Sequence, residues 1–320
     1  MRTGHSQDFG LHGGVKIPEW VDKYLGDGSE EEIVLEMGGL LDNPEAAKYV
    51  ETIGEKLVTN SKRRTAISAG DLAYKFGIVR SDTPNAFALP NGSIYVTLGL
   101  LRLMKNETEL ANVMGHEVGH VENRHSVKQV KVDLVTQGVV SLLLALGKSA
   151  LSKGQREEIK EFSLGFISNG YSRECEDEAD ADGQTLATSV GWDPRGMVEL
   201  MQLFLSMNEK RPEGIEAYMQ SHPFAGDRVA LAQKRIPSLK SGFPKATAVG
   251  EEKYKGFLSN VLKMTPTQIA AAQSGTVLKT LGPGGAVAAS QDVSILNIVG
   301  YSLIGVSALA LIYLLLVKKD

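Results

Sequence analysis

The feature that most constrains this chain is an H-E-x-x-H motif, His116-Glu117-Val118-Gly119-His120. Residues four positions apart lie on the same face of an α-helix, so in a helix both imidazoles reach one metal ion. Glu117 then lies beside them, where it is placed to act as a general base toward water. The motif predicts a zinc-dependent hydrolase if the segment is helical; the alternative is two surface histidines on a helix.

The residues around the motif independently predict a helix from Asn106 to about His125. Asn106 is a favoured N-cap residue, and Glu109 three positions later completes a pair that resembles a capping box. An apolar stripe at helical spacing follows, formed by Leu110, Val113, Met114, Val118 and Val121. The motif therefore has the helical context that its chemistry requires.

A catalytic zinc site takes three protein ligands and keeps one position open, so a third ligand is expected. His125 lies nine residues beyond His116, about 2.5 helical turns away, and is predicted to point to the other face. The segment Ser172–Asp180, SRECEDEAD, is the better source of the ligand.

Glu176 and Asp180 lie four positions apart on the helix predicted for Arg173 to about Val190. One carboxylate can bind zinc while the other accepts the second N–H of a zinc-bound imidazole. Glu174 and Glu178 are alternative ligands, and an acidic run is also usual on a solvated helix face. Two histidines and one carboxylate suit one Zn²⁺ per chain.

Four motifs follow one another in the chain and together carry a family resemblance. They are NAFALPNGSIYVTLGLL (Asn85 to Leu101), HEVGHVENRH (His116 to His125), SRECEDEADADG (Ser172 to Gly183) and SHPFAGDR (Ser221 to Arg228). The chain resembles the gluzincin family of membrane-associated zinc metallopeptidases, which includes HtpX-type proteases, CAAX prenyl endopeptidases and periplasmic outer-membrane quality-control peptidases. The resemblance covers about Asp71 to Lys234.

The resemblance implies a role for several residues. In its E-x-x-A-D pattern Glu176 is the metal ligand, and Asp180 is the residue that supports a zinc-bound imidazole. His222 matches a histidine near the metal that stabilises the oxyanion or caps zinc in a latent state; a histidine that merely begins a helix is the alternative. Arg228 and Arg173 are expected to orient acidic groups around the site or to pair at the surface.

The resemblance also implies where a substrate lies. Ser93–Thr97 reads as a β-strand, and Ser93, Ile94 and Tyr95 are expected to form an edge strand that binds a peptide in extended form. This favours an endopeptidase acting on unfolded or flexible protein segments, in membrane or envelope protein quality control. The alternative is a latent or non-catalytic zinc-binding chaperone or adaptor tethered to a membrane, but the intact Glu117 argues against a purely binding role.

The predicted fold class is α+β and predominantly helical, a zincin-like metallopeptidase domain with a small antiparallel sheet and a C-terminal transmembrane helix. We expect a flexible N-terminal segment at 1–28, the zinc metallopeptidase domain at 29–240, an extension and linker at 241–291 and the transmembrane helix at 292–317. The second apolar stretch, at 134–151, is expected to form a core helix or a hairpin over the active site, or to touch the bilayer surface.

The membrane prediction depends on residues 296–317, which contain no charged side chain and, as a helix, would cross about 30 Å of hydrocarbon. Lys318 and Lys319 follow, so the positive-inside rule places the C-terminus in the cytoplasm and the catalytic domain outside. Residues 1–14 have no apolar core typical of a signal peptide, so the alternatives are a different start of the chain or a tail-anchored chain with a cytoplasmic domain.

Charge and cysteine content exclude two other classes of protein. The chain has 34 basic and 38 acidic side chains and a net charge of −4, without the basic patch that nucleic-acid binding needs. Its single cysteine, Cys175, excludes a fold held by intrachain disulfides. The expected partners are a protein or peptide substrate and a membrane, and no feature indicates an oligomeric state.

Overall fold

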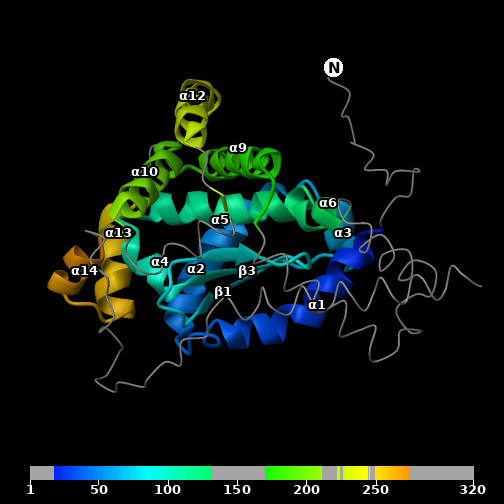
Figure 1. The fold of residues 1–320 in the computed structure, drawn as a ribbon, viewed down its shortest axis with the longest axis horizontal. Helices are drawn as coiled ribbons and strands as arrows, with labels where there is room; N and C mark the ends of the chain where they lie inside the picture. The colour runs from blue at the N-terminus through cyan, green and yellow to red at the C-terminus, as the bar shows by residue number, and fades with distance from the viewer. Residues whose placement is uncertain are drawn as a thin grey trace, which may run out of the picture.

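The computed structural model describes residues 18–130, 170–210, 222–223, 226–243, 245 and 249–273, which form helices stacked on both faces of a three-stranded sheet (Figure 1). In chain order the elements are α1 (Glu19–Glu36), α2 (Pro44–Leu57), η1 (Val58–Asn60), α3 (Arg64–Ala69), β1 (Lys75–Val79), β2 (Ala86–Ala88), β3 (Ser93–Thr97), α4 (Leu98–Leu103), α5 (Glu107–Glu122), α6 (His125–Val130), α9 (Arg173–Ser189), α10 (Arg195–Lys210), α12 (Asp227–Gly242), α13 (Glu251–Gly256), η2 (Phe257–Val261) and α14 (Pro266–Gln273).

The sheet has the strand order β1-β3-β2 and is mixed. β2 and β3 form the predicted antiparallel hairpin, with Phe87 opposite Tyr95 and the Asn91-Gly92 turn between them. Gly92 has a φ of +94°, which favours glycine. β1 pairs with the other side of β3 in parallel, with Gly77 opposite Tyr95. The prediction of an antiparallel sheet is therefore wrong for β1, because the hairpin leaves β3 one free edge and the chain reaches it in the parallel direction.

Alternating side chains of the strands separate two apolar layers. On one face Phe87 and Tyr95 pack with Val79 against Ile33 and Val34 of α1. On the other face Ile94 and Ala88 pack against Val118 and Val121 of α5. Figure 1 shows the resulting stack, with α1 below the sheet, α5 above it and α9 above α5. The layers thus place the H-E-x-x-H helix between the sheet and the helix that carries the acidic motif.

Two parts of the chain belong to the domain although the sequence predicted otherwise. Residues 19–28 are helical, and Val21 and Leu25 are buried, so the flexible segment expected at 1–28 is wrong for these residues. Residues 249–273 lie in the predicted extension, yet Tyr254, Phe257 and Leu258 join the largest hydrophobic cluster. The packed domain therefore extends beyond the predicted boundaries on both sides.

The expected transmembrane helix at 292–317 and the second apolar stretch at 134–151 lie outside the described residues. Within the part of the chain that the structure describes, no helix has the length and apolar character needed to cross a bilayer.

Helix α5 is buried along its whole length, which goes beyond the one apolar stripe predicted. Its N-terminal cap is confirmed: the Asn106 side chain accepts a hydrogen bond from the Glu109 N–H at 2.9 Å. Glu109 reciprocates, but its carboxylate accepts from the Lys105 N–H at 2.7 Å, one residue before the N-cap. A buried carboxylate in the first turn thus helps to cap the helix that carries the motif.

The pH dependence of stability tests this cap. Burial raises the pKa of Glu109 to about 7, although the Lys105 N–H and charge oppose the shift. The folded protein then binds more protons than the unfolded one between pH 4.5 and 7, so the free energy of unfolding falls as pH rises through this window. The free energy of unfolding of the unmodified protein should fall by on the order of 2–3 kcal/mol between pH 5 and 8 because of Glu109. We predict that this fall is absent in Glu109→Gln.

Urea unfolding of both proteins at the two pH values measures the difference. Glu55→Gln, at an exposed position of α2, is the matched control and should leave the pH dependence unchanged. The same pH-dependent loss in Glu109→Gln as in the unmodified protein would contradict the account.

Candidate metal centre

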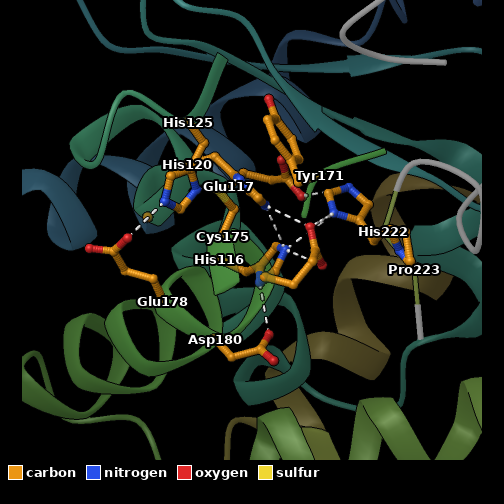
Figure 2. A network of polar contacts seen from close by, with 12 residues as sticks. His116, Glu117, His120, His125, Tyr171, Cys175, Glu178, Asp180, His222 and Pro223 are labelled. Atoms are coloured by element: carbon orange, nitrogen blue, oxygen red, sulfur yellow. Dashed lines mark hydrogen bonds and ion pairs between the residues drawn. The ribbon is translucent and has the colours of Figure 1, made fainter. Parts of the chain in front are cut away.

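Four buried side chains from three parts of the chain converge on one point. His116 and His120 come from α5, Glu176 comes from α9, and His222 comes from the segment before α12. One potential ligand atom of each lies within 4.8 Å of the other three. Figure 2 shows the rings of His116, His120 and His222 directed toward one another. The structure thus brings together the three predicted ligands and adds His222 to them.

The distances between these atoms fit a tetrahedral metal ion. His116 Nε2 lies 3.0 Å from His120 Nε2 and 3.2 Å from His222 Nδ1. Glu176 Oε1 lies 3.2 Å from His222 Nδ1 and 3.4 Å from His120 Nε2. Zinc–nitrogen bonds of about 2.0–2.1 Å at tetrahedral angles would separate the donors by about 3.3 Å. The site therefore has the size and the donor types of a zinc centre.

Glu117 lies beside this donor set and lacks the partners that a buried carboxylate normally has. Its side chain is 1% exposed, and neither oxygen has a hydrogen bond among the described residues. The nearest cationic group is the His222 ring, whose Nε2 lies 3.4 Å from Glu117 Oε1. Burial raises the pKa of Glu117, while His222 and His116 oppose the shift. A buried acceptor left without a partner is suited to a water molecule or substrate that enters the site.

Asp180 supports His116 as predicted. Its Oδ1 lies 2.9 Å from His116 Nδ1, so His116 donates there and keeps the Nε2 lone pair for a metal. Arg228 donates two hydrogen bonds of 2.8 Å to Asp180, and its Nη1 lies 2.8 Å from Glu176. Burial opposes ionisation of Asp180, but Arg228 and His116 outweigh it and lower its pKa to about 2. Arg173 instead pairs with Asp227 at the surface, which was the alternative for it.

The same balance between burial and neighbouring charges governs Glu176 and His222. Burial opposes the negative charge of Glu176, but His222 and His120 outweigh it and hold its pKa well below the usual value. Burial also opposes the positive charge of His222, but Glu176 and Glu117 raise its pKa to about 9. Burial of His120 lowers its pKa well below the usual value, so its ring is neutral and able to bind a metal.

Two residues around His120 were missed by the sequence reasoning. Tyr171 stacks on the His120 ring, with centroids 4.0 Å apart and an interplanar angle of 22°. His125, predicted to face away, has its Nδ1 only 2.8 Å from His120 Nδ1. The prediction assumed an unbroken helix, but α5 ends at Glu122 and Arg124 adopts a φ of +52°, which turns the chain back. The sequence signal for an early end of the helix was Asn123, because asparagine is common at helix ends.

Small residues let α5 and α9 pack backbone against backbone. A Cβ on Gly115 would lie 2.9 Å from the Gly183 carbonyl oxygen, and one on Gly183 would lie 2.7 Å from the His116 nitrogen. One turn along, a Cβ on Gly119 would lie 3.0 Å from the Ala179 Cα. This contact sets the distance between the histidines of α5 and Glu176 of α9.

The expected substrate strand is placed differently from the prediction. Ser93, Ile94 and Tyr95 lie in β3, the central strand, and are buried. They cannot form an edge, because β1 and β2 occupy both sides of β3. β2 is the strand at the site: the Ala86 carbonyl oxygen lies 3.4 Å from His222 Nε2.

This fold and site define a metallopeptidase class: an H-E-x-x-H helix supplies two histidines and a glutamate on a second helix supplies the third ligand. Residues 44–236 match the description "Peptidase family M48", and the chain belongs to this family. The family resemblance predicted from the four motifs is confirmed, and the predicted enzyme class, a metalloendopeptidase, agrees with it.

Several named proteases are similar in sequence to this chain. The chain is 29% identical to mitochondrial metalloendopeptidase OMA1 of Schizosaccharomyces pombe over 178 residues, 55% of this chain and 51% of that protein. It is 28% identical to the beta-barrel assembly-enhancing protease of Escherichia coli K12 over 217 residues, 63% and 41% of the two chains. It is 32% identical to metalloprotease YcaL of the same strain over 156 residues, 49% and 59%. The chain thus matches about half the length of these relatives.

The glycine contact between α5 and α9 generates a prediction. In Gly183→Ala the new methyl group must displace the backbone at His116, so we expect about 1–3 kcal/mol lower stability and weaker zinc binding. Gly28→Ala is the matched control, because Gly28 is exposed on α1 and nothing lies within 4 Å of the position where its Cβ would stand. Zinc affinity by competition with a chelator and thermal unfolding measure both effects. Equal zinc affinity in the two variants would show that the contact does not set the ligand distance.

Proposed function

We propose that this protein is a zinc-dependent endopeptidase that hydrolyses peptide bonds in unfolded or flexible protein segments. The observation that carries the proposal is Glu117, a buried carboxylate without a hydrogen bond among the described residues, beside the two histidines and the glutamate that could hold a metal ion. A metal site that only stabilised the fold would close on its ligands and would have no use for such a carboxylate. His116, His120 and Glu176 would hold one Zn²⁺ per chain.

Each residue of the site then has a task in peptide hydrolysis. Zinc, when bound, supplies Lewis acidity that polarises the peptide carbonyl and water. Glu117 takes a proton from the attacking water and returns it to the amine that leaves. Its raised pKa suits a group that must both accept and donate the proton. Asp180 and Arg228 keep His116 oriented and in the tautomer that leaves Nε2 free.

The substrate is proposed to lie along β2 rather than along β3. β2 pairs with β3 on one side, and its other side is an edge of the described sheet. An extended peptide can add to such an edge through backbone hydrogen bonds, largely without regard to its side chains. Ala86 lies next to His222, so a peptide on this edge runs past the donor set. Only a flexible or unfolded segment can adopt this conformation.

We further propose that the protein acts in membrane or envelope protein quality control. Two observations support this: a relative carries the name beta-barrel assembly-enhancing protease, and residues 296–317 have the composition of a membrane anchor. In this proposal a helix at 292–317 tethers the catalytic domain to the extracytoplasmic side of a membrane, where protein segments that have not yet folded are its substrates.

Replacing the general base separates catalysis from metal binding. We predict that Glu117→Gln still binds one zinc but cleaves casein about 10²–10⁴-fold more slowly, because it cannot accept the proton. Zinc content and the rate of casein cleavage by the full chain are the measurements. Glu174→Gln, at an exposed position on α9, is the control and should cleave normally. Cleavage by Glu117→Gln at the rate of the unmodified protein would refute the role of Glu117.

A latent form of the same enzyme is the second candidate, and the position of His222 favours it. Its Nδ1 lies 3.2 Å from both His116 Nε2 and Glu176 Oε1, which is the place of a fourth ligand. A histidine there would exclude water and substrate from the metal. His222 would then have to move away before the enzyme could act.

The two roles of His222 predict opposite results for one variant. If His222 caps the metal, His222→Ala should cleave casein several-fold faster while it retains zinc, and this is the result that the geometry predicts. If His222 stabilises the oxyanion, the same variant should lose about 10²–10³-fold in kcat. If neither the unmodified protein nor His222→Ala cleaves although both bind zinc, the non-catalytic adaptor would be favoured.

A further inference from the structure

The two histidines of the H-E-x-x-H motif are supported in different ways. His116 donates from Nδ1 directly to the Asp180 carboxylate at 2.9 Å. The corresponding atom of His120, Nδ1, lies 2.8 Å from Nδ1 of another imidazole, that of His125. The other side of the His125 ring meets a carboxylate, because its Nε2 lies 3.2 Å from Glu178 Oε2. Figure 2 shows Asp180 directed toward His116 and Glu178 directed toward His125.

We propose that His125 is a positioning residue that fixes the tautomer and the ring orientation of the metal ligand His120. His120 Nε2 points into the donor set, 3.0 Å from His116 Nε2, so it must carry a lone pair to bind a metal. The proton of the neutral His120 ring is then on Nδ1 and is donated to His125 Nδ1. His125 must therefore carry its own proton on Nε2, which it donates to Glu178.

Only this assignment of protons satisfies both contacts and leaves His120 Nε2 free. If His125 carried its proton on Nδ1, it would face the Nδ1–H of His120, or it would force the His120 proton onto the nitrogen that binds the metal. A ligand histidine usually donates its second N–H to a carboxylate, a carbonyl or water. Here the His125 imidazole accepts that hydrogen bond and in turn donates one to Glu178.

The residues beyond His125 hold this arrangement in place. Lys128 Nζ lies 2.7 Å from the same Glu178 oxygen, so α6 and α9 are joined at this point. Ser126 contacts the Tyr171 hydroxyl at 3.1 Å, and Tyr171 stacks on His120. The His120 ring is thus held at its edge by His125 and at its face by Tyr171.

The turn that brings His125 back depends on helix α1. Arg124 adopts a φ of +52°, a left-handed conformation that is unfavourable for a residue with a side chain. Its guanidinium offsets this cost by pairing with Asp22, which is 1% exposed, and by donating to the Pro18 carbonyl oxygen at 3.1 Å. The contacts therefore run from α1 through Arg124 and His125 to the metal ligand.

The proposal rests on the zinc site of the proposed function, and its test compares two variants by zinc affinity. His125→Leu fills the space but offers no acceptor, so we expect a zinc Kd about 10–100-fold higher than that of the unmodified protein. His125→Asn places Oδ1 close to the position of Nδ1 and should restore most of the affinity. Equal loss in both variants, or none in either, would overturn the proposal. If the unmodified chain bound no zinc, the proposed function itself would fail.

The contact between His125 and Glu178 can be tested with a matched pair of variants on α9. Glu178→Ala removes the acceptor of His125 and is expected to weaken zinc binding in the same direction as His125→Leu, by a smaller factor. Glu174→Ala lies one turn earlier on α9 at an exposed position and should bind zinc with unchanged affinity. The same affinity for both variants would contradict the part assigned to Glu178.

A spectroscopic test needs no variant and therefore does not depend on whether His125→Leu folds. In the zinc-loaded, ¹⁵N-labelled full chain, the contact is an N–H···N hydrogen bond between two imidazoles. We expect a ¹⁵N–¹⁵N coupling across it, from His120 Nδ1 to His125 Nδ1, with the proton assigned to His120. A proton on His120 Nε2, or one on His125 Nδ1, would overturn the proposal even if the protein binds zinc.

Discussion

The close contact between α5 and α9 is the constraint on which the rest of the structure depends. Without side chains at Gly115 and Gly183 the two helices approach until their backbones touch. Only at that separation do histidines on one helix and a glutamate on the other lie within reach of a single ion. The sheet, α2 and α10 pack against other sides of α5, which explains why every residue of α5 is buried.

Burial at this contact places several charged groups where water does not reach them. Glu176, Asp180 and Glu117 are almost completely buried, and Arg228 is the buried cation that contacts the first two. Charges in such a place are costly unless they are paired, so a divalent cation would relieve much of the imbalance. Metal binding is accordingly expected to be coupled to the stability of the domain. The charged group nearest to Glu117 is His222, whose Nε2 lies 3.4 Å from Glu117 Oε1.

Local sequence rules predicted the parts of the site that lie within single helices. The i and i+4 spacing of His116 and His120, the Asn106 cap and the support of His116 by Asp180 need only helical geometry, and the structure contains each of them. The misses involve contacts between distant segments. The parallel pairing of β1 with β3 depends on which edge the chain reaches first, and residues 19–28 of α1 were predicted to be flexible although Val21 and Leu25 are buried in the domain. His125 was missed because one left-handed residue, Arg124, reverses the direction that helical periodicity predicts.

In the proposed site α5, α9 and the segment of His222 together hold one zinc ion through imidazole and carboxylate ligands. X-ray absorption spectroscopy of the zinc-loaded full chain tests it most directly. The account predicts one zinc per chain with nitrogen and oxygen donors at about 2.0–2.1 Å and the scattering pattern of several imidazoles. A zinc–sulfur distance of about 2.3 Å, which would bring in Cys175, or a shell of oxygen atoms without imidazole would contradict it.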